Sequence, residues 1–301
     1  MAAGRAVIRR RDRPAEPTYQ GMEFPRPNGR GTRAARMPWR LPDEPALSGI
    51  AADAVSVGGL TVRAASMVGP GHRCEEPAQP RQDAYRLGRD TAKRYLLVAV
   101  ADGMSDSKRS HVGANVAVTA LVGRLRADLG KGVPLDAPGI FLDASRQMAG
   151  AAHGQGLAED DVRAAALAAV VPVEPDAAGG RDVWLAWLAD VGAWHRTGAS
   201  GGPGWRRIGG AEKGGLDAGR LSEFLPFHPG KARHAVVRVE RGAVLAFATD
   251  GIGDALTGRT AEWFARRWDE PPHVAAFVQD VGYEARGLLD DRTAVVLWCD
   301  R

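Results

Sequence analysis

Cysteine is scarce in this chain, and long apolar runs are absent. Two cysteines, Cys74 and Cys299, occur among 301 residues, too few for a disulfide framework and without the spacing of a cysteine metal site. This usage suits a reducing compartment, so we expect a cytoplasmic protein. No stretch reaches the ~20 apolar residues that a membrane-spanning helix needs. The basic N-terminus also lacks the apolar core of a secretory signal, so neither membrane insertion nor export is expected.

Excess positive charge is absent outside the first fifty residues. Residues 1–50 hold ten arginines against five acids, whereas the remainder holds 30 basic and 31 acidic residues. Seven prolines in the same fifty residues leave no apolar periodicity. We predict that residues 1–50 form a disordered, basic, Pro/Arg-rich arm and that residues 51–301 form the folded domain. No aromatic platform accompanies the arginines, so a nucleic-acid tether is the weaker interpretation and no nucleic-acid partner is expected.

The folded part alternates between strand and helix patterns without repeated βαβ units. Helical periodicity predicts helices over 111–129, 139–153, 257–267 and 273–286. Apolar or alternating runs predict strands over 60–66, 85–87, 95–101, 164–173, 183–195, 234–240, 243–248 and 293–298. This order favours an α+β fold in which two antiparallel β-sheets pack face to face and helices flank them outside, an αββα sandwich.

Acidic residues stand at the ends of several of these strands. An aspartate there is poorly placed for packing, but the strand fixes its carboxylate and an adjacent glycine lets the backbone turn beside it. Four such sites suggest a hard-metal centre assembled from distant parts of the chain. They are Gln82-Asp83, Asp102-Gly103, Asp250-Gly251 and Asp290-Asp291.

The motifs GHR…RQDAY, VAVADGMSDSKRSHVGA, FATDGIGD and LDDRTAVVLW occur in this order over residues 55–300. Together they resemble the metal-dependent protein phosphatases of type 2C, in particular the bacterial branch whose first motif is Gln-Asp. A single Asp-Gly pair is usually only a turn signal, whereas four motifs in order and in strand context are specific. The resemblance implies the αββα sandwich, with two Mg²⁺ or Mn²⁺ ions in a cleft at one end of the sheets.

The resemblance also implies a role for each aspartate in the motifs. Asp102 would bridge the two ions and the backbone carbonyl of Gly103 would bind the second. Asp250 and Asp290 would bind the first ion, and Asp83 would belong to the metal site by orienting metal-bound water. A pair of divalent ions neutralises phosphoryl charge and makes water acidic, so a water between the ions would attack phosphorus directly.

Other roles remain open at this stage. Asp291 is the alternative to Asp290, and Asp190 is a candidate ligand for a weak third ion. His72 and Arg73 are the candidate catalytic residues, His72 as general acid or phosphate contact and Arg73 as phosphate contact. Arg81 competes with Arg73, because a guanidinium binds phosphate through two hydrogen bonds.

Two departures from the family pattern leave two functions to consider. Met104-Ser105 replaces residues that in many relatives include a histidine and a glycine, and Gln82 replaces a glutamate. We predict a cytoplasmic, monomeric phosphoserine/phosphothreonine protein phosphatase of bacterial signalling. Its substrate would be a phosphorylated protein, with a Ser/Thr kinase as a further partner. The alternative is a pseudophosphatase, a regulatory module that binds phosphoproteins without turnover.

Overall fold

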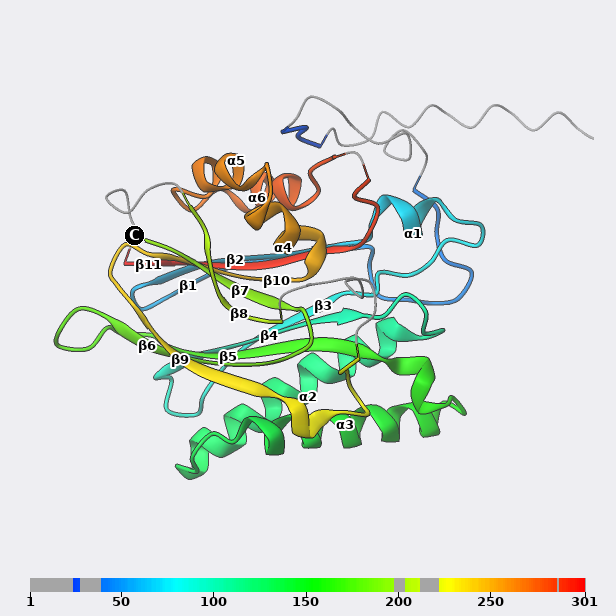
Figure 1. Ribbon diagram of the computed structural model, residues 1–301, viewed down its shortest axis with the longest axis horizontal. Helices are drawn as coiled ribbons and strands as arrows, with labels where there is room; N and C mark the ends of the chain where they lie inside the picture. Colours follow the sequence, from blue (N-terminus) through cyan, green and yellow to red (C-terminus); the bar gives the residue numbers. More distant parts are fainter. Residues whose placement is uncertain (1–23, 28–38, 198–203, 212–221, 286, 301) are drawn as a thin grey trace, which may run out of the picture.

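The computed structural model describes residues 24–27, 39–197, 204–211, 222–285 and 287–300. Its elements stack as two β-sheets with helices on both outer faces (Figure 1). The predicted αββα sandwich is therefore confirmed. Among the described helices, none has both the length and the apolar character that crossing a bilayer requires.

The first sheet contains six antiparallel strands. Their order is β1 (Ile50–Val57), β2 (Leu60–Met67), β11 (Arg292–Cys299), β10 (Val244–Ala248), β7 (Gly192–Arg196) and β8 (Arg206–Gly209). Residues near both ends of the domain thus meet in mid-sheet, since β11 pairs with β2 on one side and β10 on the other. The register sets Thr293 opposite Ser66 and Ala294 opposite Ala248.

The second sheet contains five antiparallel strands. Their order is β3 (Ala84–Arg89), β4 (Tyr95–Gly103), β5 (Ala164–Pro172), β6 (Arg181–Leu188) and β9 (Arg233–Val239). The apolar run of β4 is buried on both faces: Leu97 and Ala99 pack toward the helices, and Leu96 and Val98 pack toward the other sheet. Such two-sided burial explains why this strand shows no alternation of polar and apolar residues.

Helices cover the two outer faces unequally. The long helices α2 (Ser110–Lys131) and α3 (Ala137–Gly154) pack on the second sheet. The short helices α4 (Asp250–Thr257), α5 (Ala261–Arg267) and α6 (Val274–Val281) cover the first sheet (Figure 1). Turns of 3-10 helix lie at Glu159–Val162 and Pro229–Lys231, and the five-residue helix α1 (Pro70–Cys74) follows β2.

Three expectations about the elements need correction. The strand predicted over 183–195 is two strands, β6 and β7, which belong to different sheets. The chain changes sheets at Ala189, whose φ of 68° is left-handed although it is not a glycine. The helix predicted over 257–267 is α5, which begins only at Ala261, and the helix predicted over 273–286 ends at Val281; helix α4, which begins at Asp250, had no prediction. Strand β1 had no prediction, because five of its eight residues are polar or alanine.

Described parts of the predicted arm contact the folded domain. Phe24 is 9% exposed, and its ring lies 6.5 Å from that of Trp39. The carbonyl of Pro25 accepts a hydrogen bond of 2.8 Å from the backbone N–H of Glu284. Residues 39–49 then run over the surface to β1, which starts at Ile50 inside the predicted arm. The rest of the arm, residues 1–23 and 28–38, lies outside the described residues.

Candidate metal centre

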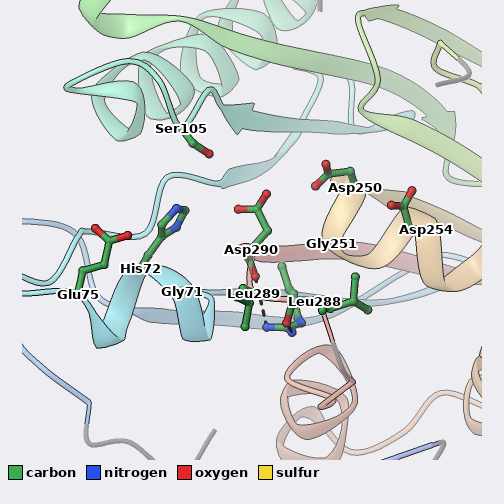
Figure 2. Close-up of a pocket in the computed structure, with 12 residues that line it drawn as sticks. Gly71, His72, Glu75, Ser105, Asp250, Gly251, Asp254, Leu288, Leu289 and Asp290 are labelled. Carbon is green, nitrogen blue, oxygen red and sulfur yellow. Dashed lines mark hydrogen bonds between the residues drawn. The ribbon is translucent and has the colours of Figure 1, made fainter. Parts of the chain in front are cut away.

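The four predicted aspartates come together at one end of the sandwich. Asp102 is the penultimate residue of β4, and Asp250 is the first residue of α4. Asp83 immediately precedes β3, and Asp290 lies two residues before β11. Figure 2 shows the side chains of Asp250 and Asp290 facing the same cavity from different elements. The cavity has a volume of about 380 Å³. The position of the cavity follows from the strand register, because each of these acids lies next to the end of a strand at the same end of the sandwich.

Asp102 occupies the electrostatic centre of this group. Burial raises the pKa of its carboxyl well above the usual range, and the nearby charges of Asp83, Asp250, Asp290 and Asp190 raise it further. Asp190 sits at the corner between β6 and β7 and is 7% exposed. Within the described residues, no hydrogen-bond donor contacts the Asp102 carboxylate. A site of this kind favours a bound cation, because only added positive charge relieves the mutual repulsion.

Asp83 is held in place by a threonine. It is 2% exposed, and its Oδ2 accepts a 2.7 Å hydrogen bond from the hydroxyl of Thr249. The same hydroxyl accepts the backbone N–H of Thr293 at 3.1 Å. Burial and the charges of Asp291 and Asp290 raise the pKa of Asp83 well above its usual range, against the opposing effect of Thr249. Thr249 therefore fixes the orientation of Asp83 without neutralising it.

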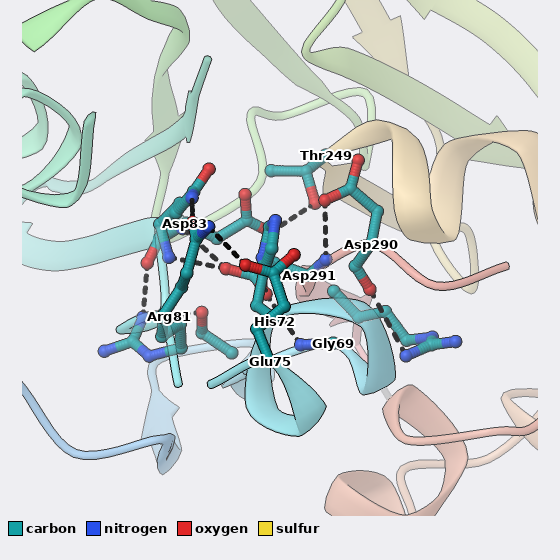
Figure 3. Close-up of polar contacts among 12 residues, drawn as sticks. Gly69, His72, Glu75, Arg81, Asp83, Thr249, Asp290 and Asp291 are labelled. Atoms are coloured by element: carbon teal, nitrogen blue, oxygen red, sulfur yellow. Dashed lines mark hydrogen bonds and ion pairs between the residues drawn. The ribbon is translucent and has the colours of Figure 1, made fainter. Parts of the chain in front are cut away.

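Asp291 ties three chain segments together beneath the cavity. Its Oδ1 accepts the backbone N–H of Gly69 at 2.6 Å and contacts His72 Nδ1 at 2.9 Å. Its Oδ2 accepts the backbone N–H groups of Gln82 and Asp83 (Figure 3). A carboxylate that already accepts these contacts and is 2% exposed serves to position other groups. The choice left open between Asp290 and Asp291 thus favours Asp290, which is exposed to the cavity.

His72 faces the cavity from the short helix α1. Burial disfavours its charged form, but the hydrogen bond to Asp291 and the charges of Asp291, Asp290 and Asp83 together raise the pKa of His72 to about 9. Gly69 allows α1 to start directly against the backbone of Asp290, since a Cβ at residue 69 would collide with the Asp290 carbonyl. With Nδ1 engaged by Asp291, Nε2 is the nitrogen that remains to meet a ligand.

The two candidate arginines point elsewhere. The guanidinium of Arg73 lies 4.7 Å from the centre of the Trp39 ring, and Arg73 is 3% exposed. Arg81 donates to Ser66 Oγ at 2.6 Å and to the backbone carbonyls of Ser48 and Asp83. Neither residue lines the cavity. Of the three residues predicted to contact phosphate, only His72 lines the cavity, whereas Arg81 reaches the backbone of Asp83 from outside it.

Several cavity residues were missing from the sequence prediction. Asp254 lies one helical turn after Asp250 on α4 and so shares its face. Glu75 and Ser105 line the opposite side of the cavity (Figure 2). Arg292 donates to the carbonyls of Leu288 and Asp290, which holds the loop before β11 in place. A helix prediction starting at residue 250 would have revealed Asp254 through its spacing of four.

The backbone at Gly103 is too close to its neighbours for a side chain. A Cβ there would lie 2.8 Å from the carbonyl oxygen of Gln82 and 2.9 Å from atoms of Ser110. Glycine therefore lets β4 end directly against the loop that carries Asp83. Beyond it, Met104 is half-buried and Ser105 is exposed beside the cavity, so the altered loop leaves the aspartate cluster in place.

The donor set fits hard divalent cations. Carboxylates select ions such as Mg²⁺ and Mn²⁺ over softer metals, and burial together with neighbouring aspartates raises the pKa values of Asp83, Asp102 and Asp290, an effect that bound cations would oppose. Among the described residues, the tightest group of potential ligand atoms, all within 4.8 Å, belongs to His72, Asp290 and Asp291. The aspartates of the cluster are more widely spaced. Mg²⁺ keeps several waters and takes few carboxylates directly, so it does not require all of these aspartates as ligands.

The chain belongs to the protein phosphatase 2C family, because a family model described as "Protein phosphatase 2C" matches residues 69–276. The resemblance inferred from the motifs is thereby confirmed. The match starts at the turn before α1 and ends in α6, so it includes His72, Asp83, Asp102 and Asp250. No curated protein matches the chain.

Solved structures share the fold at low sequence identity. Serine/threonine phosphatase Stp1 from Staphylococcus aureus is 13% identical, with a TM-score of 0.59 over 82% of this chain and 98% of that one. The S. agalactiae serine/threonine phosphatase is 14% identical, with a TM-score of 0.53 over 80% and 99%. RsbX in complex with magnesium is 13% identical, with a TM-score of 0.55 over 83% and 100%. These structures have the same αββα sandwich as this chain.

Proposed function

We propose that this protein is a Mg²⁺- or Mn²⁺-dependent phosphatase that removes phosphate from phosphoserine and phosphothreonine in proteins. One observation carries the proposal: Asp102 lies among the charges of Asp83, Asp250 and Asp290, which come from three other segments. Membership in the protein phosphatase 2C family supports it, as does the fold shared with two serine/threonine phosphatases. The substrate would be a phosphorylated protein, so the protein would oppose a Ser/Thr kinase.

Asp102, Asp250 and Asp290 would hold the ions, with the Gly103 carbonyl as a further ligand. Bound divalent ions supply charge neutralisation at the phosphoryl oxygens and acidify water. Asp83, fixed by Thr249, would orient the water that attacks phosphorus. A new P–O bond to water forms as the P–O bond to the serine or threonine oxygen breaks, without a covalent phosphoenzyme.

His72 would deliver the proton that the leaving oxygen needs. Its pKa of about 9 keeps the ring protonated at neutral pH, and Asp291 holds its orientation through Nδ1. An alkoxide of serine or threonine is a poor leaving group, so protonation of that oxygen lowers the barrier. Met104 stands where many relatives carry a histidine, and His72 would take over the role of proton donor.

The experiment is hydrolysis of p-nitrophenyl phosphate with added Mn²⁺ by the wild-type protein, Asp102→Ala and Asp250→Ala. We expect each variant to lose about 10²-fold or more in kcat, because each removes a charged ligand. Calorimetric titration with Mn²⁺ gives a readout that does not depend on turnover. Equal rates in all three proteins would overturn the proposal. Metal uptake without any hydrolysis would instead point to a phosphoprotein-binding module.

A further inference from the structure

A strap formed by residues 39–49 crosses the surface beside the metal centre. It is held at two points by ion pairs: Arg40 contacts Glu76 at 2.8 Å, and Glu44 contacts Arg109. Trp39 adds a third attachment through the guanidinium of Arg73. Because Glu76 follows α1 and Arg109 precedes α2, the strap spans the two loops that border the cavity.

A groove separates the strap from these loops. Its volume is about 520 Å³, and it is lined by strap residues 42–46, residues 75–80 and the loop from Ser105 to Arg109. Glu75 and Ser105 line both this groove and the cavity of the metal centre. Figure 2 places these two side chains on the side of the cavity away from Asp254. The groove is therefore continuous with the place where a phosphoryl group would sit.

The lining of the groove is predominantly acidic. Asp43, Glu44, Glu75, Glu76 and Asp106 face it, against the cations of Lys108 and Arg109. His111 also lines the groove, and burial together with the charge of Arg109 lowers the pKa of its ring, which favours its neutral form.

Some of these acidic side chains already form ion pairs within the protein. Glu44, Glu76 and Asp106 each have an arginine partner, at Arg109, Arg40 and Arg163 respectively. Within the described residues, Asp43 and Glu75 have no ion pair, and Glu75 accepts one hydrogen bond of 2.6 Å from Gln79. Asp43 and Glu75 are both exposed, one on each wall. The groove thus has two carboxylates ready for a cationic ligand.

Apolar surface accompanies these carboxylates. Pro42, Pro45 and Ala46 contribute it from the strap, and Pro77 and Pro80 contribute it from the opposite wall. Lysine and arginine side chains combine an aliphatic stem with a charged end. A groove with apolar sides and carboxylates suits such side chains better than it suits acidic or small polar ones.

We propose that the strap groove binds basic residues flanking the phosphorylated serine or threonine, so that the protein prefers phosphopeptides rich in Lys and Arg next to the phosphate. This inference rests on the proposed function for the phosphoryl position. It adds a specificity determinant, Asp43, that lies outside the region matched by the family model. The strap would therefore select among substrates, while the aspartate cluster acts on phosphate itself.

The test compares three phosphothreonine peptides of equal length, with Arg, Ala or Glu at the positions flanking the phosphothreonine. The measured quantity is kcat/KM for phosphate release with Mn²⁺, expressed within each protein as the ratio of the Arg peptide to the Ala peptide. We expect a ratio of about five or more in the wild-type protein, because each exposed charge pair contributes a few-fold. Asp43→Lys should lower the ratio at least threefold. At 1 M NaCl, where the screening length is ~3 Å, the preference should disappear.

Glu174→Lys is the matched control. It makes the same charge change at an exposed residue after β5, at the opposite end of the strands from Asp102, and it should keep the wild-type ratio. A wild-type ratio near one, or an equal drop of the ratio in both variants, would overturn the proposal that the groove binds basic residues while leaving the phosphatase proposal intact. If no substrate is hydrolysed, the phosphatase proposal fails. Fluorescence anisotropy then measures the affinity for the same peptides carrying a label. The proposal that the groove binds basic residues is overturned if Asp43→Lys binds the Arg peptide as tightly as the wild-type protein does.

Discussion

The two ends of the β-sandwich differ in how their charged side chains are arranged. At the end that carries the metal centre, burial and like charges raise the pKa values of Asp83, Asp102 and Asp290. At the other end, Arg181 is 1% exposed and its guanidinium contacts both oxygens of Asp300, at 2.5 and 2.9 Å. The pKa of Asp300 is lowered by that hydrogen bond. At one end the acidic and basic groups pair, and at the other Asp83, Asp102 and Asp290 lie close enough to raise one another's pKa values or that of a shared neighbour.

This difference distinguishes charged side chains that stabilise the fold, such as Arg181 and Asp300, from the aspartates that we propose bind metal ions. A buried arginine with a two-point carboxylate partner satisfies both groups within the protein. Aspartates that repel one another cost stability, and groups in a cavity whose pKa values are perturbed in this way mark a functional site more often than a structural one. The comparison predicts that substitutions at the two ends shift activity and stability in different directions.

The largest effect is expected from Asp102→Asn at the metal-centre end. Losing the central carboxylate should lower kcat for p-nitrophenyl phosphate about 10³-fold, which corresponds to ~4 kcal/mol of transition-state stabilisation. In EDTA, the same variant should be more stable than wild type at pH 7.5, because the raised pKa of Asp102 means that ionisation destabilises the fold.

The sign of that stability effect can be checked against pH. For a carboxyl with a raised pKa in the folded state, its stabilising contribution is present below the unfolded value of ~4 and is lost as pH rises through the folded pKa. Thermal unfolding of metal-free protein should thus show the advantage of Asp102→Asn growing from pH 5 to pH 7.5. A variant less stable than wild type at pH 7.5 would contradict the comparison.

Asp300→Ala should have the next largest effect, on stability alone. It leaves Arg181 buried without its partner, which costs about 3 kcal/mol and lowers Tm by about 6–12 °C. Because the pKa of Asp300 is lowered, its contribution exists above the unfolded value of ~4 and is lost as pH falls through the folded pKa. The difference from wild type should therefore shrink below pH 4.

Asp182→Ala is the control for this end of the sandwich. The Asp182 side chain is 65% exposed and contacts Arg238 at 3.4 Å, so its loss should change Tm by no more than about 2 °C. Circular dichroism melts of the two variants make the test. If Asp182→Ala destabilised as much as Asp300→Ala, burial of Arg181 would not explain the effect.

His72→Gln should have an intermediate effect that depends on the leaving group. Without a proton donor, kcat for a phosphothreonine peptide should fall about 10- to 30-fold, whereas p-nitrophenolate leaves without protonation and its rate should fall less than threefold. The wild-type peptide rate should decline as pH rises toward 9, because the donor loses its proton; bound cations would move that decline to lower pH. Equal losses on both substrates would remove His72 as general acid.

Asp254→Asn is expected to have the smallest effect. Asp254 shares the α4 face of Asp250 but is exposed at the cavity rim, where charge is screened. We expect kcat/KM for p-nitrophenyl phosphate to fall less than fivefold, against a loss of 10²-fold or more for Asp250→Ala. Similar losses in the two variants would show that the charged centre extends further along α4 than proposed.

The central part of this architecture could be predicted because its signals are local. The buried run of β4 ends in Asp102-Gly103, and the acids before β3 and β11 adjoin recognisable strand patterns. In two packed antiparallel sheets the ends of these strands lie at the same end of the sandwich, which is why the sequence could predict that the aspartates lie near one another. The placement of His72 beside them followed only from the resemblance to a family.

What could not be predicted depends on contacts between distant residues. Gly251 and Gly253 make FATDGIGD look like a turn, yet Gly253 lies against Trp194 with no room for a Cβ, so packing keeps this stretch helical. The corner at Ala189 carries no glycine or proline signal. Arg73 meets Trp39 across 34 residues of chain, and nothing in the local pattern of either residue indicates that contact.

The hydrogen bonds of Asp291 also have a consequence for the order of events during synthesis. Asp291 holds the backbone at Gly69 and Gln82, and the strand that follows it lies between β2 and β10. A nascent chain can pair β3 with β4, which brings Asp83 beside Asp102, but it cannot add Asp290 to the cluster until the segment that carries β11 has been translated. Under the proposed function, a partly made chain on the ribosome is inert toward phosphoproteins, and activity begins only once the last strand has inserted.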